Sequence, residues 1–125
     1  MKIHVKAYFR FWGWTIADRI PCEIPGCGLM SVDIMHIIPK QRGGNNDAVE
    51  FIENYMAADR KHHSKYEGRS KDELLALNAL KFLIERPNHI WTDKFRATAF
   101  FKNHIEPFPD KEELITHLNS IKLIG

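Results

Sequence analysis

A cysteine pair followed by a histidine-rich stretch is the feature that most constrains this sequence. Cys22 and Cys27 are five positions apart and enclose Pro25-Gly26, a dipeptide that favours a tight turn. Such a turn brings two thiols toward one point, as the local half of a tetrahedral metal site requires. With no secretory signal recognisable ahead of them, the two cysteines indicate metal ligation in a reducing compartment more than a disulfide. Taken alone, the pair also fits two small apolar residues in an unliganded turn.

The composition is that of a soluble globular protein. The 125 residues, of which 44% are hydrophobic and 27% charged, are enough for one small domain. No apolar run approaches the roughly 18 residues of a membrane span, so we expect no membrane association and a cytoplasmic location. The formal net charge of +2 is weak support for a nucleic-acid partner.

Apolar spacing predicts an α+β fold in which helices flank a small strand pair. Residues 2–12 carry aliphatic and aromatic side chains at helical intervals. Residues 32–38 are rich in β-branched and apolar types and predict a strand that Pro39 ends. Residues 48–54 fit either a short returning strand or a helical turn, and residues 57–67 fit a helix.

The remainder of the chain is predicted to be helical. Ser70-Lys71-Asp72-Glu73 has the pattern of a capping box and opens a helix that ends near Arg86. Pro109-Asp110 marks the start of a final helix. An exposed aromatic patch in this extension would leave a homodimer or a protein partner open. The patch consists of Phe95, Phe100, Phe101 and Phe108.

One ordered set of residues continues from the cysteine pair into the predicted helix. Its members are Cys22, Cys27, the run Asp33 to Pro39 with His36, Gly43-Gly44, Asn54 and, nine residues later, His63. In this order the set resembles the HNH endonucleases, in particular small HNH proteins of bacteria and their phages. The resemblance covers about residues 8–86. It implies a helical lead-in (1–21), a ββα-metal (HNH) finger with a zinc-knuckle-like element (22–69), and a C-terminal helical extension (70–125).

The resemblance also implies an activity, metal-dependent hydrolysis of phosphodiester bonds in DNA, in a bacterial or phage-infected cell. It assigns the general base to His36, the orienting asparagine of the second strand to Asn54, and a ligand of the catalytic divalent metal, Mg²⁺ or another ion, to His63. An imidazole with a pKa near about 6.5 is suited to deprotonating water at neutral pH. A divalent cation stabilises the charge that gathers on phosphoryl oxygens.

One departure from the family pattern concerns that catalytic metal. Met35 stands where HNH enzymes carry a second metal ligand, and a thioether is a poor ligand for a hard cation. Asp33, on the same predicted strand face, is one candidate substitute. Glu67 is the other, because colicin-type relatives place a ligand at that spacing from the final histidine.

A second departure concerns structural zinc. Zinc-bearing relatives have a second cysteine pair where this chain has Asp59 and His62. Both are ligand types for zinc, so the resemblance implies a structural Zn²⁺ site formed by Cys22, Cys27, Asp59 and His62. The alternative is a knuckle that packing holds without a metal.

Cationic residues near these motifs are candidate contacts to the phosphate backbone of DNA. They are Lys40, Arg42, Lys61, Lys65 and Arg69. No base-reading motif is present in the sequence, which implies little sequence specificity. Three functions remain open: an active endonuclease, a catalytically impaired HNH scaffold that binds DNA or a protein partner, and a small zinc-dependent structural protein. Met35 favours the scaffold over the enzyme.

Overall fold

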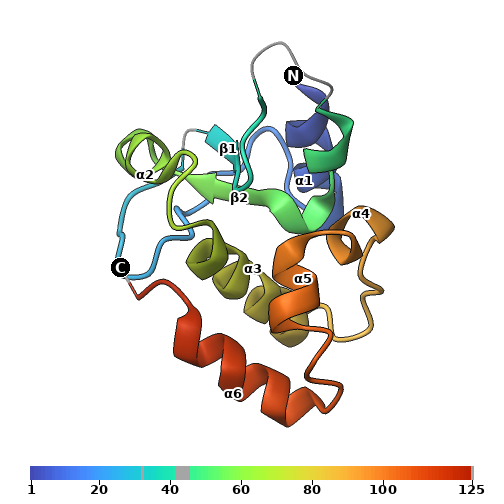
Figure 1. The fold of residues 1–125 in the computed structure, drawn as a ribbon. Coiled ribbons are helices and arrows are strands. Elements are labelled where there is room, and N and C mark those ends of the chain that lie inside the picture. Colours follow the sequence, from blue (N-terminus) through green and yellow to red (C-terminus); the bar gives the residue numbers. More distant parts are fainter. Residues whose placement is uncertain (32, 42–45, 125) are drawn as a thin grey trace.

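The fold is α+β. A computed structural model describes residues 1–31, 33–41 and 46–124, and in these residues it contains one two-stranded sheet and six α-helices. Strand β1 (Asp33–His36) pairs antiparallel with β2 (Tyr55–Ala58). Helix α2 (Arg60–Tyr66) follows β2 almost directly, so residues 22–69 form a strand–strand–helix arrangement that we call the central unit (Figure 1).

Helices cover the two faces of the sheet. On one face, Ile34 and Ala57 pack with Tyr8 of helix α1 (Ile3–Trp12). On the other face, Met35 packs into the larger apolar core, which includes side chains of helix α3 (Lys71–Glu85). This division follows from the alternation of side chains along a strand, which places successive residues on opposite faces.

Three short helices complete the chain and, with α3, form a group that we call the C-terminal helices. They are α4 (Asp93–Arg96), α5 (Ala99–His104) and α6 (Lys111–Ile121). Helix α6 lies along α3 (Figure 1). Each of the three begins at a residue whose side chain accepts a hydrogen bond from a backbone N–H of the first turn, which satisfies a donor that the helix itself leaves unpaired. These capping residues are Thr92, Thr98 and Asp110.

The segment before β2 folds as 3-10 turns. They are η1 (Asp47–Val49) and η2 (Ile52–Asn54), so of the two alternatives for residues 48–54 the helical turn is the one that forms. Asn54 therefore lies in the turn that ends at β2, and its expected place on the second strand is wrong. The strand instead takes the next four residues, up to the cap of α2.

Several sequence-based predictions can be compared directly with the structure. The first helix is confirmed, and Gly13 ends it with a left-handed φ of 78°. The capping box is wrong: Ser70 has a φ of 51° and its side chain makes no capping hydrogen bond, although the helix does begin at the next residue. None of the described helices is long and apolar enough to cross a membrane.

The expected aromatic surface of the C-terminal extension is also wrong. Phe95, Phe100 and Phe101 are only 0%, 4% and 9% exposed, and all three belong to the main core, against which Phe108 packs from a partly buried position. They are inside because Phe95 stacks on Phe51 and contacts both Phe100 and Phe101, so the rings cover one another. A homodimer or protein partner for this extension stays a prediction, without this patch to support it.

Candidate functional site

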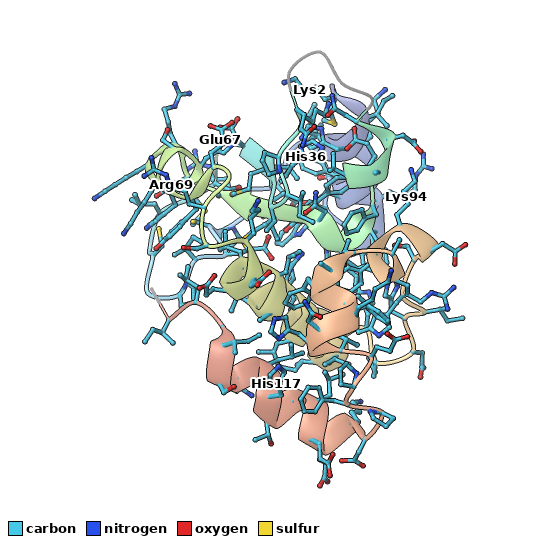
Figure 2. All side chains as sticks on the ribbon, viewed as in Figure 1. Lys2, His36, Glu67, Arg69, Lys94 and His117 are labelled. Atoms are coloured by element: carbon cyan, nitrogen blue, oxygen red, sulfur yellow. The ribbon has the colours of Figure 1, made fainter. Side chains whose placement is uncertain are left out.

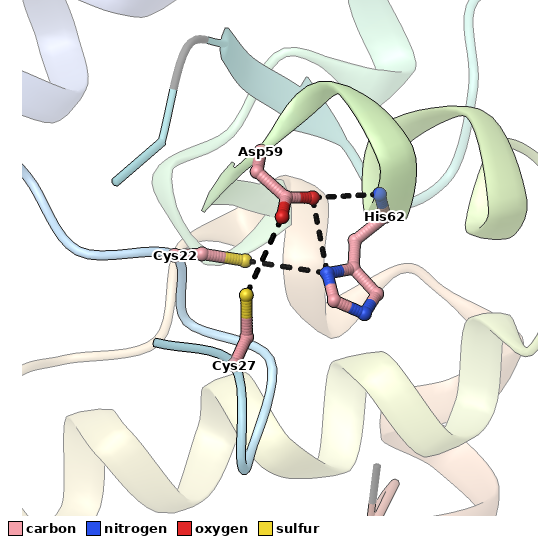
Figure 3. Close-up of side chains that lie close together, drawn as sticks. All are labelled: Cys22, Cys27, Asp59 and His62. Carbon is pink, nitrogen blue, oxygen red and sulfur yellow. Dashed lines mark hydrogen bonds and ion pairs between the residues drawn. The ribbon is translucent and has the colours of Figure 1, made fainter. Parts of the chain in front are cut away.

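Four candidate metal ligands converge at the start of α2 (Figure 3). Cys22 and Cys27 come from the loop before β1, and Asp59 and His62 come from the N-terminus of α2. One ligand atom from each lies within 4.8 Å of those from the other three. This is the group of residues that the sequence predicts, and it could hold a metal ion.

The loop that carries the cysteines has a defined geometry. Gly26 has a φ of 79°, a left-handed conformation that glycine adopts without strain. This turn lets the backbone N–H of Cys27 donate to the carbonyl of Ile24 at 3.1 Å. The N–H of Cys22 donates to the carbonyl of Leu29 at 3.0 Å, which closes the loop behind the turn. Both thiols are free and point toward α2.

Two distances within this group are close to those of a tetrahedral site. Ligand atoms that bind zinc at about 2.0–2.3 Å lie about 3.3–3.8 Å from one another. Sγ of Cys22 lies 3.8 Å from Nδ1 of His62, and Sγ of Cys27 lies 3.4 Å from Oδ2 of Asp59. Asp59 also caps α2, because its Oδ1 accepts a hydrogen bond from the N–H of His62 at 2.7 Å. The cap fixes one oxygen and turns the other toward the thiols.

Hydrogen bonds in the group shift two pKa values. The backbone N–H of His62 lowers the pKa of Asp59, and the Cys27 thiol and the His62 ring add to this against the opposing effect of burial. The N–H of Leu29 would lower the pKa of Cys27, but burial and the neighbouring Asp59 and Cys22 together raise it. The thiol of Cys27 thus stays protonated at neutral pH unless a cation replaces that proton.

A second feature is a cavity of about 580 Å³ beside the sheet, bounded by α1, β1 and α2. Its walls include the residues predicted to act in catalysis at the end of β1 and on α2. These are Asp33, His36, His63 and Glu67. Asn54 is not one of the lining residues, but it contacts the segment that follows His36.

His36 is held by a carboxylate that the sequence analysis did not identify. Its Nε2–H donates to Oε1 of Glu50 at 2.5 Å, and the ring packs against both His4 and Tyr55, with centroids 4.4 and 5.3 Å away. The hydroxyl of Tyr55 donates to the same Glu50 oxygen at 3.1 Å. Because an ionised carboxylate can only accept, the proton of a neutral His36 ring lies on Nε2 and Nδ1 carries a free lone pair.

The pKa of Glu50 is consistent with an ionised partner. Burial acts to raise this pKa, but the hydrogen bond and charge of His36, the hydroxyl of Tyr55 and the ammonium of Lys40 outweigh it, so the pKa is lowered. At neutral pH Glu50 is therefore an anion against the ring of His36. This anion stabilises the imidazolium that forms when His36 takes up a proton.

His4 is a further residue of this site that the sequence analysis missed. It is 7% exposed, and its Nε2–H donates to the carbonyl of Ile34 at 2.7 Å. Burial lowers its pKa, and nearby His36 and Lys40 act in the same direction against that hydrogen bond and Glu50. His4 is thus a neutral ring that packs against His36 at an interplanar angle of 45°. Nothing local in the sequence indicates this, because α1 reaches the end of β1 only in the folded chain.

Asn54 ties together the two segments that flank the loop after β1. It is fully buried, and its Oδ1 accepts from the N–H of Ile38 at 2.7 Å. Its Nδ2 donates to the carbonyls of Ile38 and Val49 at 3.0 and 2.9 Å. Its own carbonyl accepts from the N–H of Ile37 at 2.9 Å. These bonds fix the backbone on the C-terminal side of His36.

The predicted ligands of the catalytic metal are brought together in part. Nδ1 of His63 lies 3.0 Å from Oδ2 of Asp33. Glu67 is exposed on the wall of the same cavity, but among the described residues it does not form with them a group whose ligand atoms all lie within 4.8 Å. Met35 is 1% exposed and belongs to the apolar core, so its thioether packs as a core side chain.

The predicted phosphate contacts are exposed cations around this site. Lys40 lines the cavity and lies 3.6 Å from a Glu50 oxygen. Lys61, Lys65 and Arg69 are exposed on or just after α2, and Figure 2 labels Arg69 there. Arg42 and Gly43-Gly44 lie outside the described residues.

Two further cations, Lys2 and Arg19, also line the cavity. Sequence analysis did not select them, since they belong to no motif and only the packing of α1 and the segment after it brings them to the cavity. Figure 2 shows Lys2 close to His36 in this view.

Comparison with known proteins adds no relative. No protein-family model, no curated protein and no solved structure matches this chain. What the coordinates define is an α+β chain with a group of candidate metal ligands on one side of α2 and a histidine-lined cavity on the other side.

Proposed function

We propose that this chain is a metal-dependent endonuclease of the HNH type, in which β1, β2 and α2 form the ββα-metal finger and the substrate is DNA. The observation that supports this most is one cavity lined by His36, from the end of β1, and by His63, from α2. A candidate general base and a candidate metal ligand that line one cavity support this proposal, because phosphodiester hydrolysis uses a base and a divalent cation at the same phosphate.

In this proposal His36 is the general base. The bond from its Nε2–H to Glu50 leaves Nδ1 to accept a proton from water. Glu50 then stabilises the imidazolium, and the His4 ring packed against His36 limits its motion. Asn54 acts as a positioning residue, because it holds the backbone next to His36.

Asp33 and His63 are the residues that would hold a catalytic divalent metal. Cis ligands on an ion with bonds of about 2.0–2.1 Å are about 2.9 Å apart, close to the 3.0 Å between Oδ2 of Asp33 and Nδ1 of His63. One carboxylate and one imidazole suit Mg²⁺ or Mn²⁺ with water filling the other positions. When bound, such an ion stabilises charge on the phosphoryl oxygens. Asp33 thereby replaces the ligand that the family has at Met35.

The Cys22, Cys27, Asp59 and His62 group is proposed as a structural Zn²⁺ site. A local thiol pair and two ligands on the helix cap are suited to a closed tetrahedral site, which fixes α2 against the cysteine loop. Elemental analysis of purified protein should find about one zinc per chain, and much less in Cys22→Ser. Equal zinc content in the two proteins would contradict this assignment.

The exposed cations are proposed to bind the DNA backbone. Lys2, Arg19 and Lys40 surround the cavity, and the cations of α2 extend the basic surface. Phosphate contacts of this kind lose affinity steeply with added salt, because binding releases counterions. Charge reversal at Arg19 should therefore weaken binding of all DNA sequences alike. It should also reduce the slope of log affinity against log salt concentration by about one, the contribution of one phosphate contact.

A plasmid-nicking assay tests the enzyme. Zinc-loaded protein is incubated with supercoiled DNA and Mg²⁺, Mn²⁺ or Ni²⁺, and His36→Ala is expected to lower the cleavage rate by about 10²–10⁴-fold, as loss of a general base does. His89→Gln is no suitable control, since His89 is bonded to the buried Glu53. His117→Gln is a suitable control in Mg²⁺ and Mn²⁺, because His117 lies at the opposite end of the molecule in Figure 2. Cleavage that persists at the wild-type rate in His36→Ala would contradict the proposal.

The scaffold is the second candidate, and the burial of Met35 favours it. The position where the family has a ligand faces the core, and of the candidate ligands of the catalytic metal only Asp33 and His63 bring ligand atoms together in the described part of the chain. The scaffold predicts salt-dependent DNA binding without cleavage in any of these metals. The same nicking assay, run beside a binding measurement, separates it from the enzyme.

A further inference from the structure

The C-terminal helices bring two histidine rings into direct contact. His104 lies at the end of α5 and His117 lies within α6. Nδ1 of His104 is 3.0 Å from Nε2 of His117, and the rings are nearly parallel, with centroids 5.3 Å apart. Both rings are half-buried, with access to solvent. Neither residue takes part in the proposed endonuclease.

We propose that His104 and His117 form a second metal site, for a transition-metal ion such as Ni²⁺, Cu²⁺ or Zn²⁺. Imidazole nitrogens select these ions over Mg²⁺ and Ca²⁺, which prefer oxygen. Two nitrogens that bind one ion at about 2.0–2.1 Å are about 2.9–3.4 Å apart, depending on the coordination geometry. The observed 3.0 Å lies in this range. Solvent would complete the coordination of such an ion.

A carboxylate on a third helix favours the tautomer of His104 that can bind a metal ion. Oδ2 of Asp72, in the first turn of α3, lies 3.8 Å from Nε2 of His104, the ring nitrogen that faces away from His117. A carboxylate in that position favours the proton on Nε2 and leaves the lone pair of Nδ1 directed at His117. Metal-bound histidines usually have such a partner on their other nitrogen, which fixes the tautomer and raises the basicity of the ligand.

Aromatic packing holds both rings in place. Phe108 stacks on His117 with centroids 4.2 Å apart and an interplanar angle of 16°. Phe100 packs against His104 with centroids 5.1 Å apart. Rings fixed in this way lose little conformational freedom on binding an ion, which favours binding by as few as two protein ligands. An ion bound here would link α5 to α6.

The alternative explanation is a hydrogen bond between two neutral imidazoles, in which one nitrogen donates and the other accepts. That bond accounts for the distance but needs neither the carboxylate on Nε2 nor access to solvent. The two explanations differ in one measurable property, since only the metal site predicts a stoichiometric ion that depends on both histidines.

Titration calorimetry of the zinc-loaded protein with Ni²⁺ tests the proposal. His104→Gln and His117→Gln should each remove one bound Ni²⁺ per chain or weaken its binding by about tenfold or more. Asp72→Asn should weaken it by less, about threefold, because the Asp72 side chain is 63% exposed. His63→Ala controls for Ni²⁺ at the proposed catalytic site and should leave the His104/His117 ion in place.

Thermal unfolding supplies a second readout. In the His63→Ala background, where the proposed catalytic site is removed, Ni²⁺ should raise the Tm, and adding His117→Gln should abolish this rise, because an ion bound only to the folded state stabilises it. Circular dichroism checks that the Gln variants are folded. Equal Ni²⁺ stoichiometry and affinity in wild type and His117→Gln would overturn the proposal. So would binding that is weak and unchanged in all variants, which is adventitious.

Discussion

The central unit and the C-terminal helices are held together by different kinds of contact. The strands of the central unit have four residues each and its helix has seven. Elements this short have little apolar surface, and buried polar groups such as Asn54 and the Cys/Asp/His group connect them. The C-terminal helices instead bury large apolar side chains against one another. The principal ones are Leu74, Phe95, Phe100, Leu114 and Leu118.

The difference indicates that the two regions have different roles. Polar groups fix distances and directions, which a site for ions and phosphate requires. Apolar contacts are less directional, and they supply the stability on which such a site depends. Between the two regions, the buried Glu53 accepts hydrogen bonds from His89 and Thr92 just before α4. The C-terminal helices therefore support the cavity through the turn that carries Asn54.

Of the changes that test this difference, metal removal should have the largest effect on the free energy of unfolding. If zinc holds the cysteine loop to α2, a strong chelator or Cys22→Ser should lower the free energy of unfolding by about 5 kcal/mol or more, because the binding energy of a structural zinc is folding energy. Denaturant unfolding of zinc-loaded and chelated protein measures this. Unfolding curves that coincide would show that packing alone holds the knuckle.

Asn54→Ala should have the next largest effect and lower the free energy of unfolding by about 3–5 kcal/mol, because the substitution leaves three part-buried backbone groups of Ile38 and Val49 without their partner. Asn119→Ala is the matched control. Asn119 is exposed on α6 and donates one local hydrogen bond, so this substitution should lower the free energy of unfolding by less than about 0.5 kcal/mol. Similar losses in the two variants would mean that Asn54 does not organise the central unit.

Leu118→Ala tests the C-terminal helices. Leu118 is fully buried, and its truncation should cost about 3 kcal/mol through lost burial and the cavity that remains. This loss should be the same with and without chelator, in contrast to substitutions in the central unit. Ile84→Ala, at a position 71% exposed, should change stability by less than about 0.5 kcal/mol. If Leu118→Ala no longer lowered the free energy of unfolding after chelation, the two regions would have to be regarded as one metal-dependent unit.

The smallest expected effect is the contribution of Glu50 to the pH dependence of stability. Its pKa is lowered on folding, so its contribution to stability is fully present above the unfolded-state pKa of about 4.3 and is lost as pH falls through the lower folded value. Glu50→Gln should flatten the stability profile below about pH 4.5. An acid profile identical to the wild type would show that the His36–Glu50 contact is absent in solution.

Local patterns made much of the central unit predictable. The Pro25-Gly26 turn and the helical spacing of Asp59 and His62 are short-range features. Together with the resemblance to zinc-bearing HNH proteins, they predicted the group of four ligands that the structure brings together. The α+β class followed in the same way from the period of the apolar residues. The capping box failed because Ser70 takes a left-handed conformation after Gly68, and sequence pattern does not determine that angle.

The contacts that the sequence did not reveal join segments far apart in the chain. Glu50 is 14 residues from His36, and His4 packs on that ring from another helix. The His104–His117 pair likewise depends on how α5 and α6 pack. A glutamate in a polar turn or a histidine on an amphipathic helix carries no local sign of such a partner. Aromatic residues of α4 and α5 were misjudged for the same reason, since burial is a property of the tertiary structure.

The most direct test of the account is the Mn²⁺ dependence of plasmid nicking by wild type, Asp33→Asn and Glu67→Gln, each loaded with zinc. If Asp33 and His63 share an ion beside His36, the wild type cleaves DNA, and Asp33→Asn needs about tenfold more Mn²⁺ or more for the same rate. Glu67→Gln should stay within about threefold of wild type, because its carboxylate does not converge with theirs. No cleavage by the wild type at any Mn²⁺ concentration, or an unchanged requirement in Asp33→Asn, would contradict the account.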